Sequence, residues 1–330
     1  HTIIFISHKL SEVMEISDRV TVMRSGKVVG TEDTNKVTVQ QLSNMMVGRD
    51  VELELPRPQS SLDNMGDVRL LVRGVTYARD GKEVLKDVSL KVRSGEILGI
   101  AGIEGNGQAE LVEVLTGLAK CDHGAIEICG QDATGKQPGE IRELGLSHIP
   151  QDRMTFGVAA GASIAENLIS TRYKKPPISN GMLLNLKGIF SVCTDLINKF
   201  EIKASGPEQP VKTLSGGNIQ KVVVAREFST DPYVIIANQP TRGIDIGASE
   251  SIHKYLVDAT EKGAAVLLVS ADLAEVMGLS NRLIVMYEGR VVAHFDDAEA
   301  TTEEELGLYM LGVKHQEPHE ILASMMGEAS

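Results

Sequence analysis

The stretch that decides the fold is "GEILGIAGIEGNGQAEL", residues 95–111. Its apolar first half is typical of a buried strand, and a helical pattern begins at Gln108. Between them, Gly102, Gly105 and Gly107 let the backbone curl so that several N–H groups can point at one anion, and the helix end adds its positive dipole. The stretch therefore predicts a phosphate-binding loop between a strand and a helix, with a structural glycine turn as the alternative.

The loop departs from the usual phosphate-binding pattern at two positions. That pattern carries a lysine for the β- and γ-phosphates and a serine or threonine for Mg²⁺. Gln108 and Ala109 stand at these two positions. The loop is therefore predicted to hold phosphate without the usual cation. The predicted contacts to nucleotide from this loop are Gly102, Gly105, Asn106, Gly107, Gln108, Ala109 and Glu110.

A second stretch, "YVIIANQPTRG" (residues 233–243), carries a similar departure. Its apolar run predicts a short buried strand that ends at Asn238 and Gln239, before Pro240. A nucleotide-hydrolysing site would carry two carboxylates here, one for Mg²⁺ and one for the attacking water. A neutral amide cannot take a proton from water, and losing a general base costs on the order of 10² to 10⁴ in rate. With the metal ligands gone, the amides remove a repulsion that carboxylates would exert on phosphate.

An internal repeat divides the chain. Residues 3–30 and residues 266–293 align without a gap and match at roughly a dozen positions. Each copy is predicted to fold as strand, short helix, strand, tight turn and strand. The chain opens at His1, inside an apolar run, so we expect it to hold the tail of one unit followed by a complete second unit.

The predicted domain boundaries follow from this repeat. Residues 1–54 are the remnant of the first unit, and residues 55–66 are a linker rich in Pro, Ser, Asn and Gly. Residues 67–312 form the second unit, and residues 313–330 are expected to be a frayed, solvated tail. Alternating strand and helix patterns in the second unit predict an α/β fold with a mainly parallel sheet.

Composition excludes several classes of protein. The formal net charge of −12 argues against nucleic-acid binding, which rests on Lys and Arg against phosphates. No run of 18 apolar residues predicts a membrane span, and no signal segment opens the chain. The three cysteines form no metal or disulfide pattern, which indicates buried structural roles.

A third stretch, "LSGGNIQK" (residues 214–221), carries a resemblance to a known family. Following the glycine-rich loop and preceding the "YVIIAN" strand, it resembles the signature of the ATP-binding cassette (ABC) ATPases, and the resemblance covers nearly the whole chain. Asn218 replaces the commoner glutamine of that signature. The resemblance implies a P-loop NTPase (RecA-like) nucleotide-binding domain with an antiparallel β subdomain and a helical signature subdomain. The implied signature residues are Leu214, Ser215, Gly216, Gly217, Asn218 and Gln220.

The resemblance implies roles for five further positions. Gln151, in "HIPQDR", matches the glutamine loop that contacts the transport partner, and Asp245, in "TRGID", matches the loop at the dimer interface. Tyr77 matches the adenine-stacking aromatic, with an ordinary strand aromatic as the alternative. His8, in the first copy of the repeat, matches the switch histidine near the γ-phosphate, and the second copy has Ala271 there.

Two such cassettes face each other head to tail in this family. The signature at 214–217 would therefore serve the ATP of the first cassette, together with His8. The second pocket, with its amides and without its lysine, would bind ATP weakly and not hydrolyse it. Mg²⁺ is expected at the first-cassette site only, no metal site is expected in this chain, and the fragment alone is expected to be inactive.

Fused cassettes with "PTRGID" and "IPQDR" segments resemble the ATPase subunits of bacterial simple-sugar and nucleoside importers, and the amides at 238–239 favour the nucleoside type. That resemblance implies two membrane permease subunits, an indirectly contacted substrate-binding lipoprotein, no nucleic acid, and a peripheral place on the cytoplasmic face of the bacterial plasma membrane. The alternatives are a pentose or hexose importer, a two-cassette translation factor and a nucleotide-dependent scaffold. The degenerate pocket and the short linker argue against the translation factor.

Overall fold

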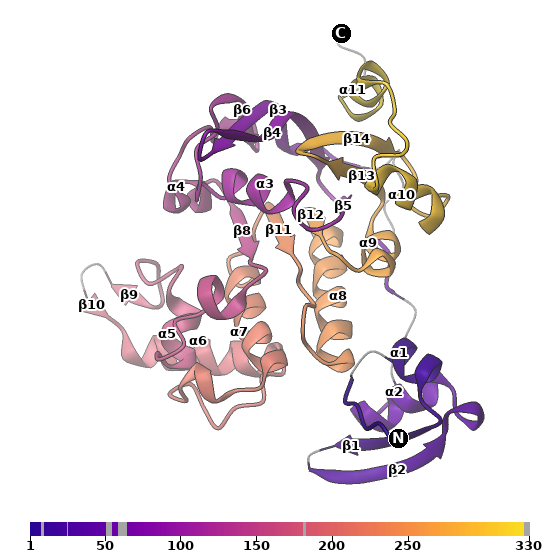
Figure 1. Cartoon of the computed structure of the whole chain (residues 1–330). Coiled ribbons are helices and arrows are strands. Elements are labelled where there is room, and N and C mark those ends of the chain that lie inside the picture. Colours follow the sequence, from indigo (N-terminus) through magenta and orange to yellow (C-terminus); the bar gives the residue numbers. More distant parts are fainter. Residues whose placement is uncertain (8–9, 25, 51–54, 59–64, 181–182, 327–330) are drawn as a thin grey trace.

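The structure, a computed structural model, describes residues 1–7, 10–24, 26–50, 55–58, 65–180 and 183–326. His8 lies outside these residues. The chain forms a small N-terminal unit and a larger second unit, and the long helix α8 (Ile246–Glu261) of the second unit reaches toward the first (Figure 1).

A six-stranded sheet forms the centre of the second unit, in the order β14-β13-β5-β12-β11-β8. Five strands are parallel, and the edge strand β14 runs antiparallel to β13. Every residue of β5, β11 and β12 is buried, as expected for short apolar runs covered on both faces. The strands are β5 (Ile97–Ala101), β8 (Leu146–Ile149), β11 (Val234–Asn238), β12 (Ala265–Val269), β13 (Arg282–Tyr287) and β14 (Arg290–Phe295).

A four-stranded antiparallel sheet lies beside the central one, in the order β4-β3-β6-β7. Its alternating apolar side chains, including Leu70, Val72 and Leu90, share one core with helix α3 (Gln108–Leu115) and with β5. Its strands are β3 (Val68–Arg79), β4 (Lys82–Arg93), β6 (His123–Ile128) and β7 (Gln131–Asp132), and the short helix α4 (Pro138–Glu143) follows them.

A helical subdomain occupies the far end of the sheet, below β8 and β11 in Figure 1. Its apolar residues continue the core that α8 covers, and Phe200 is its largest fully buried side chain. Its elements are η3 (Arg153–Gly157), α5 (Ile164–Ile169), β9 (Ser179–Asn180), β10 (Leu183–Leu184), α6 (Leu186–Lys199), η4 (Val211–Thr213) and α7 (Gly216–Phe228). The fold is therefore the α/β cassette with antiparallel and helical subdomains that the sequence predicts.

The two copies of the repeat fold alike. In the first, α1 (Leu10–Ile16), β1 (Arg19–Arg24), β2 (Lys27–Asp33), η1 (Thr34–Lys36) and α2 (Val39–Val47) follow one another. In the second, α9 (Leu273–Leu279), β13, β14 and α10 (Glu303–Met310) follow one another in the corresponding order of helix, two strands and helix. Both hairpins shift register at the same place, between Val22 and Met23 and between Val285 and Met286.

The predicted strand at the start of the first copy does not form. Residues 1–7 are irregular, and Ile3, Ile4 and Ile6 are 82%, 91% and 100% exposed. The matching strand of the second copy, β12, is hydrogen-bonded to β11 on one side and to β5 on the other. The first copy has no such neighbours among the described residues, and an apolar run without partner strands has no sheet to join.

The expectation of a frayed tail is also wrong. Helix α11 (Pro318–Met326) packs against β4 and β14, and it buries Ile321 and Met325. Ser324 Oγ lies 2.8 Å from His294 Nδ1 and donates to Asp296 Oδ2 at 2.9 Å. The apolar spacing of four between Ile321 and Met325 places both on one face, which is what docks the helix.

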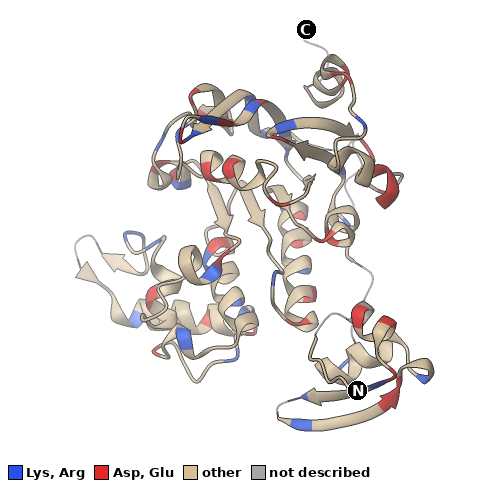
Figure 2. Cartoon of the chain, in the orientation of Figure 1, with Lys and Arg blue, Asp and Glu red and all other residues tan. Residues whose placement is uncertain are grey.

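Charged residues of both signs are spread along the whole fold (Figure 2). The densest acidic run is the first turn of α10, with Glu303, Glu304 and Glu305 following the N-cap Thr302. Carboxylates suit a helix N-terminus because they face the positive end of its dipole. None of the described helices combines the length and the apolar composition that a bilayer span requires.

Candidate functional site: a degenerate phosphate pocket

A small pocket of about 30 Å³ lies where β5, β8, β11 and β12 end. Carboxyl ends of parallel strands are the usual place for a ligand in an open α/β sheet. The pocket brings together eight residues that the sequence predicts, from four separate segments. Those eight are Gly102, Gly105, Gln108, Ala109, Gln151, Asn238, Gln239 and Ala271, and Ile100, Glu104, Val269 and Ser270 complete the lining.

The phosphate loop is fixed in place by the hairpin between β13 and β14. The side-chain oxygen of Asn106 accepts from the Glu288 N–H at 3.0 Å, and the Asn106 carbonyl accepts from the Gly289 N–H at 3.0 Å. Gly107 has a φ of 102°, and a Cβ there would lie 3.1 Å from Gly289 Cα. The loop is therefore held in the curled form without any ligand.

Gln108 lies inside the loop it begins. Its side-chain nitrogen Nε2 donates to the Ile103 carbonyl at 3.2 Å, and a Cβ on Gly102 would lie 2.1 Å from that nitrogen. The residue is buried, at 7% exposure. The amide that replaces the lysine is thus bound to the loop backbone and brings no charge to a phosphate.

Gln239 is held by the segment that would carry the switch histidine. Its backbone N–H donates to the Val269 carbonyl at 2.7 Å, and its Oε1 accepts from the Ala271 N–H at 3.2 Å. Its φ of 51° is uncommon for a residue with a side chain and indicates a constrained turn. Asn238, the last residue of β11, is buried beside it.

The residues at the strand ends do not fit a magnesium ion. Mg²⁺ prefers carboxylate oxygens and phosphates, and here it would meet the methyl of Ala109 and the amides of Asn238 and Gln239. Within the described ranges, no three His, Cys, Asp or Glu side chains come together in a way that could hold a metal ion. The glycine loop fits a phosphate, and the rest of the pocket does not supply the metal that usually accompanies one.

The signature residues lie outside this pocket. Ser215 is the N-cap of α7, is exposed, and accepts a 2.8 Å hydrogen bond from the Asn218 side chain. Asn218 also accepts from the Lys203 N–H at 2.7 Å. Gln220 is buried and donates to the Pro240 carbonyl at 2.8 Å, so the signature helix is attached to the loop after β11.

The two signature glycines pack against the segment 242–245. A Cβ on Gly217 would lie 2.9 Å from Asp245 Oδ2, and a Cβ on Gly216 would lie 2.7 Å from the Arg153 guanidinium. Asp245 is in turn the N-cap of α8 and accepts from the Ala248 N–H at 3.0 Å. The glycines are therefore required by close packing as well as by any ligand.

Of the predicted nucleotide contacts, Tyr77 and Glu110 do not line the pocket, whereas Gln151 does. Tyr77 does not line the pocket; it lies on β3, with the Arg79 guanidinium 5.8 Å from its ring centre. Glu110 faces away as well, 3.4 Å from Arg79 Nη1. Gln151 lines the pocket, and its side chain donates to Glu104 Oε1 at 3.1 Å.

Sequence reasoning missed two groups of residues near the site. Arg153 donates to the carbonyls of Arg242 at 2.6 Å and Gly243 at 3.1 Å. Glu275, on α9, accepts from the Thr241 hydroxyl at 2.7 Å and lies 2.7 Å from His253 Nε2. The repeat held a signal for this second group, because a glutamate stands at the same place in both copies.

Glu275 is a buried, charged anchor. Burial alone would raise the pKa of its carboxyl, but the hydrogen bonds from His253, Ser270 and Thr241 and the charge of the His253 ring outweigh it, and the pKa of Glu275 lies below the usual range. The carboxylate therefore joins α8, α9 and the loop after β11 by charge-assisted hydrogen bonds.

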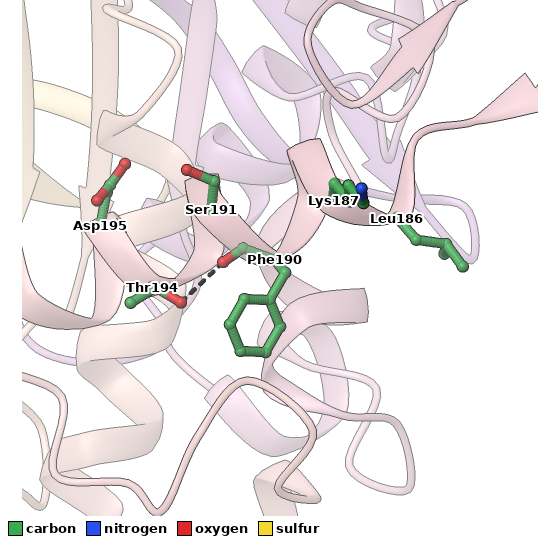
Figure 3. A pocket seen from close by; sticks show the side chains of 6 residues that line it. All are labelled: Leu186, Lys187, Phe190, Ser191, Thr194 and Asp195. Atoms are coloured by element: carbon green, nitrogen blue, oxygen red, sulfur yellow. Dashed lines mark hydrogen bonds between the residues drawn. The ribbon is translucent and has the colours of Figure 1, made fainter.

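A second concavity lies on the outer face of α6, far from these residues. This open groove of about 520 Å³ is lined by residues of α6 alone, and Phe190 projects from the helix into it (Figure 3). The Thr194 hydroxyl donates to the Phe190 carbonyl at 2.8 Å, so it is satisfied within the helix. No predicted site residue lines this groove.

The fold and the pocket together define a P-loop nucleotide-binding cassette. Residues 85–242 match the protein family described as "ABC transporter". The chain belongs to this family of ATP-binding cassette proteins.

Several curated relatives of the chain are named as import ATP-binding proteins. The chain is 39% identical over 312 residues to the nucleoside import ATP-binding protein NupA of Lactococcus lactis subsp. cremoris, which covers 94% of this chain and 61% of the relative. It is 41% identical over 303 residues to the guanosine import ATP-binding protein NupO of Bacillus subtilis, covering 92% and 59%. It is 40% identical over 314 residues to the glucose import ATP-binding protein TsgD13 of Haloferax volcanii, covering 94% and 56%. The chain thus spans about three fifths of these relatives.

Solved structures agree on the fold. The ADP conformation of MJ1267, an ATP-binding cassette of an ABC transporter, superposes with a TM-score of 0.59 at 21% identity, covering 79% of this chain and 99% of that one. The dimeric cassette MJ0796 superposes with a TM-score of 0.60 at 21% identity, covering 70% and 100%.

Proposed function

We propose that the chain is the C-terminal part of the ATP-binding subunit of a tandem-cassette importer, and that the importer takes up nucleosides or simple sugars. The names of the relatives support this class of cargo, since two are named for nucleosides and one for glucose. The amides at Asn238 and Gln239 favour the nucleoside type. Such a subunit would couple ATP hydrolysis to uptake. It would work on the cytoplasmic face of the bacterial plasma membrane with two permease subunits, and it would contact the substrate-binding lipoprotein only indirectly.

Within this subunit, the second pocket would hold nucleotide weakly, without Mg²⁺, and would not hydrolyse it. The observation that carries this proposal is the pocket lining, which has Gln108 in place of the lysine and the amides of Asn238 and Gln239 in place of both carboxylates. Hydrolysis needs a charge-stabilising cation and a group that orients or deprotonates water. Neither is supplied by these side chains.

The signature of this cassette would serve the other site, that of the first cassette with His8. Ser215 is exposed and lies outside its own pocket. Its hydroxyl and the N–H groups of Gly216 and Gly217 stand at the N-terminus of α7, where an anion is favoured. ATP with Mg²⁺ would bind at that first site.

The test is the ATPase rate of the full-length protein with its permease. Ser215→Asp keeps an N-cap oxygen for α7 but brings a negative charge toward the phosphate. We expect it to lower the turnover rate by about a hundredfold, as the loss of one preorganised donor does. Asn185→Asp adds the same charge at the N-cap of α6 and is the matched control, which should keep the rate. His8→Ala should also stop turnover.

Two outcomes would contradict the proposal. Full turnover with Ser215→Asp would show that this signature serves no hydrolytic site. Purification of the full-length protein without a permease, and with ribosomes instead, would favour the translation-factor class.

A further inference from the structure

Glu104 gives the nucleotide pocket its only formal charge among the described lining residues, and that charge is negative. It belongs to the phosphate loop itself, between Ile103 and Gly105. No lysine or arginine lines the pocket, and Arg242, which lies 3.8 Å from the Glu104 carboxylate, stands outside the lining. The loop whose backbone N–H groups suit a phosphate therefore carries a carboxylate itself.

The carboxylate of Glu104 reaches from the loop toward the strand ends. Its Oε1 accepts from Gln151 Nε2 at 3.1 Å, and Arg242 Nη1 lies 3.8 Å from the same oxygen. Gln151 follows β8, and Arg242 follows β11 after Pro240. The side chain therefore bridges the mouth of the pocket on the side of Asn238 and Gln239.

That side is where the end of a triphosphate belongs. In a phosphate loop the backbone N–H groups hold the α- and β-phosphates, while the lysine reaches the β- and γ-phosphates. Here the backbone cradle is present, but Gln108 is bound to the Ile103 carbonyl instead. A terminal phosphate would lack the lysine of the usual loop and would face the Glu104 carboxylate, which is paired with Arg242 at 3.8 Å.

We propose that Glu104 makes this pocket selective for nucleoside diphosphates over nucleoside triphosphates. The carboxylate takes the hydrogen bond of Gln151 that a terminal phosphate would need, and it repels that phosphate. A diphosphate ends within the backbone cradle and leaves the Glu104–Gln151 bridge in place. This inference rests on the proposed function, in which the second pocket holds nucleotide.

The test compares ADP and ATP at the second pocket of the full-length protein in EDTA. Photolabelling with 8-azido-ADP and 8-azido-ATP, followed by peptide mapping, reports each cassette separately, and unlabelled nucleotide gives the affinity by competition. Wild-type protein should prefer ADP. Glu104→Gln keeps the shape and removes the charge, and it should raise the affinity for ATP by at least about tenfold while ADP changes little.

Glu113→Gln is the matched control. Glu113 lies on α3, the helix that follows the phosphate loop, but it pairs with Arg79 and does not line the pocket. It should leave both affinities as they are. If Glu113→Gln raised ATP affinity as much as Glu104→Gln, the effect would be one of general charge and the proposal would be wrong.

The remaining outcomes separate this inference from the proposed function. If both nucleotides label the second pocket and Glu104→Gln leaves their ratio unchanged, the selectivity is disproved while the pocket still holds nucleotide. If neither nucleotide labels that pocket in any variant, the proposed function of the pocket fails and the selectivity fails with it.

Discussion

Gly217 has no room for a side chain. A Cβ there would lie 2.9 Å from Asp245 Oδ2 and 3.1 Å from Ala248 Cβ, and both neighbours belong to the start of α8. The Asp245 side chain, which caps α8, would have to move, and Ala248 Cβ would have to give way by a few tenths of an ångström. The glycine is thus part of the contact between the signature helix and the segment that ends at Asp245.

Gly217→Ala should therefore lower the stability of the cassette by about 1–3 kcal/mol, the usual cost of overpacking. Chemical denaturation followed by circular dichroism measures this. Gly307→Ala is the control, because Gly307 lies inside α10 with no atom within 4 Å of the added Cβ. That variant should be neutral or should stabilise by up to about 1 kcal/mol, since alanine is the better helix former. Equal effects of the two variants would contradict the packing argument.

At the residue scale, spacing and resemblance predicted most of the polar residues that meet in the pocket but not what their side chains do. Gln108 and Ala109 are identified by their distance from Gly102 along the chain. That Gln108 binds the loop carbonyl, and that Glu104 bridges to Gln151, depends on rotamers that no sequence pattern encodes.

At the scale of elements, the sequence pattern predicted the repeat and failed where an element depends on its neighbours. The run at Ile3–Ile6 has the composition of a strand, yet a strand needs partners to hydrogen-bond its backbone. Helix α11 was missed for the opposite reason, because the partners that bury its apolar face, β4 and β14, lie far away in the sequence. Short segments are decided by tertiary contacts that local patterns do not contain.

Met325 tests whether α11 belongs to the cassette. It is fully buried in the core that includes β4, so Met325→Ala should cost about 2–5 kcal/mol in the free energy of unfolding. Leu322→Ala, at a position that is 45% exposed, is the control and should cost much less. Similar denaturation midpoints for wild type and Met325→Ala would mean that α11 is not docked in solution.

Two histidine rings, that of His294 beside α11 and that of His148 on β8, predict a loss of stability in mild acid. Burial, together with the nearby charges of Arg282 and Lys91 and against that of Asp296, lowers the pKa of His294 from an ordinary 6.5 to about 4. Burial also lowers the pKa of His148 to about 4. Both rings stay neutral in the folded state, whereas in the unfolded chain they take up protons near pH 6.5.

Their contribution is therefore complete above pH 6.5 and is lost as the pH falls from 6.5 toward 4. At pH 5, each ring lowers the free energy of unfolding by roughly 2 kcal/mol relative to its value above pH 6.5. His294→Gln keeps a hydrogen-bonding side chain and removes one titration, so the difference in unfolding free energy between pH 7 and pH 5 should shrink by about that amount. His123→Gln, which removes an exposed imidazole, controls for the loss of a ring. An unchanged pH dependence in His294→Gln would contradict the argument.

At the scale of the whole molecule, the two units touch through α8. Arg49 binds Glu250 with both of its terminal nitrogens, at 3.2 and 2.8 Å, and Val47 lies against Gly247. The linker residue Leu55 packs over Gly278 on α9. The start of α8 therefore contacts both the signature and the first unit.

Arg153 connects the segment at 151–153, the signature and the loop after β11. It follows Gln151, it donates to the carbonyls of Arg242 and Gly243, and its guanidinium lies against the signature at Gly216. Movement of the segment at 151–153 would thus be passed both to the signature and to the loop that leads to Asp245. Two hydrogen bonds from one planar guanidinium fix an orientation as well as a distance.

Arg153→Lys should uncouple these segments, because a lysine can approach one carbonyl but cannot hold both in a fixed geometry. In the full-length protein with the permease proposed above, we expect the turnover number to fall by about tenfold while the KM for ATP changes little, since the signature would be misplaced rather than missing. Arg290→Lys, at an exposed position on β14, is the matched control and should keep the rate. A proportional loss of thermal stability in Arg153→Lys, or a change in KM alone, would instead mean that Arg153 only supports the fold or the nucleotide. Retained turnover would mean that the signature is positioned by Gln220 and the glycine contacts without it.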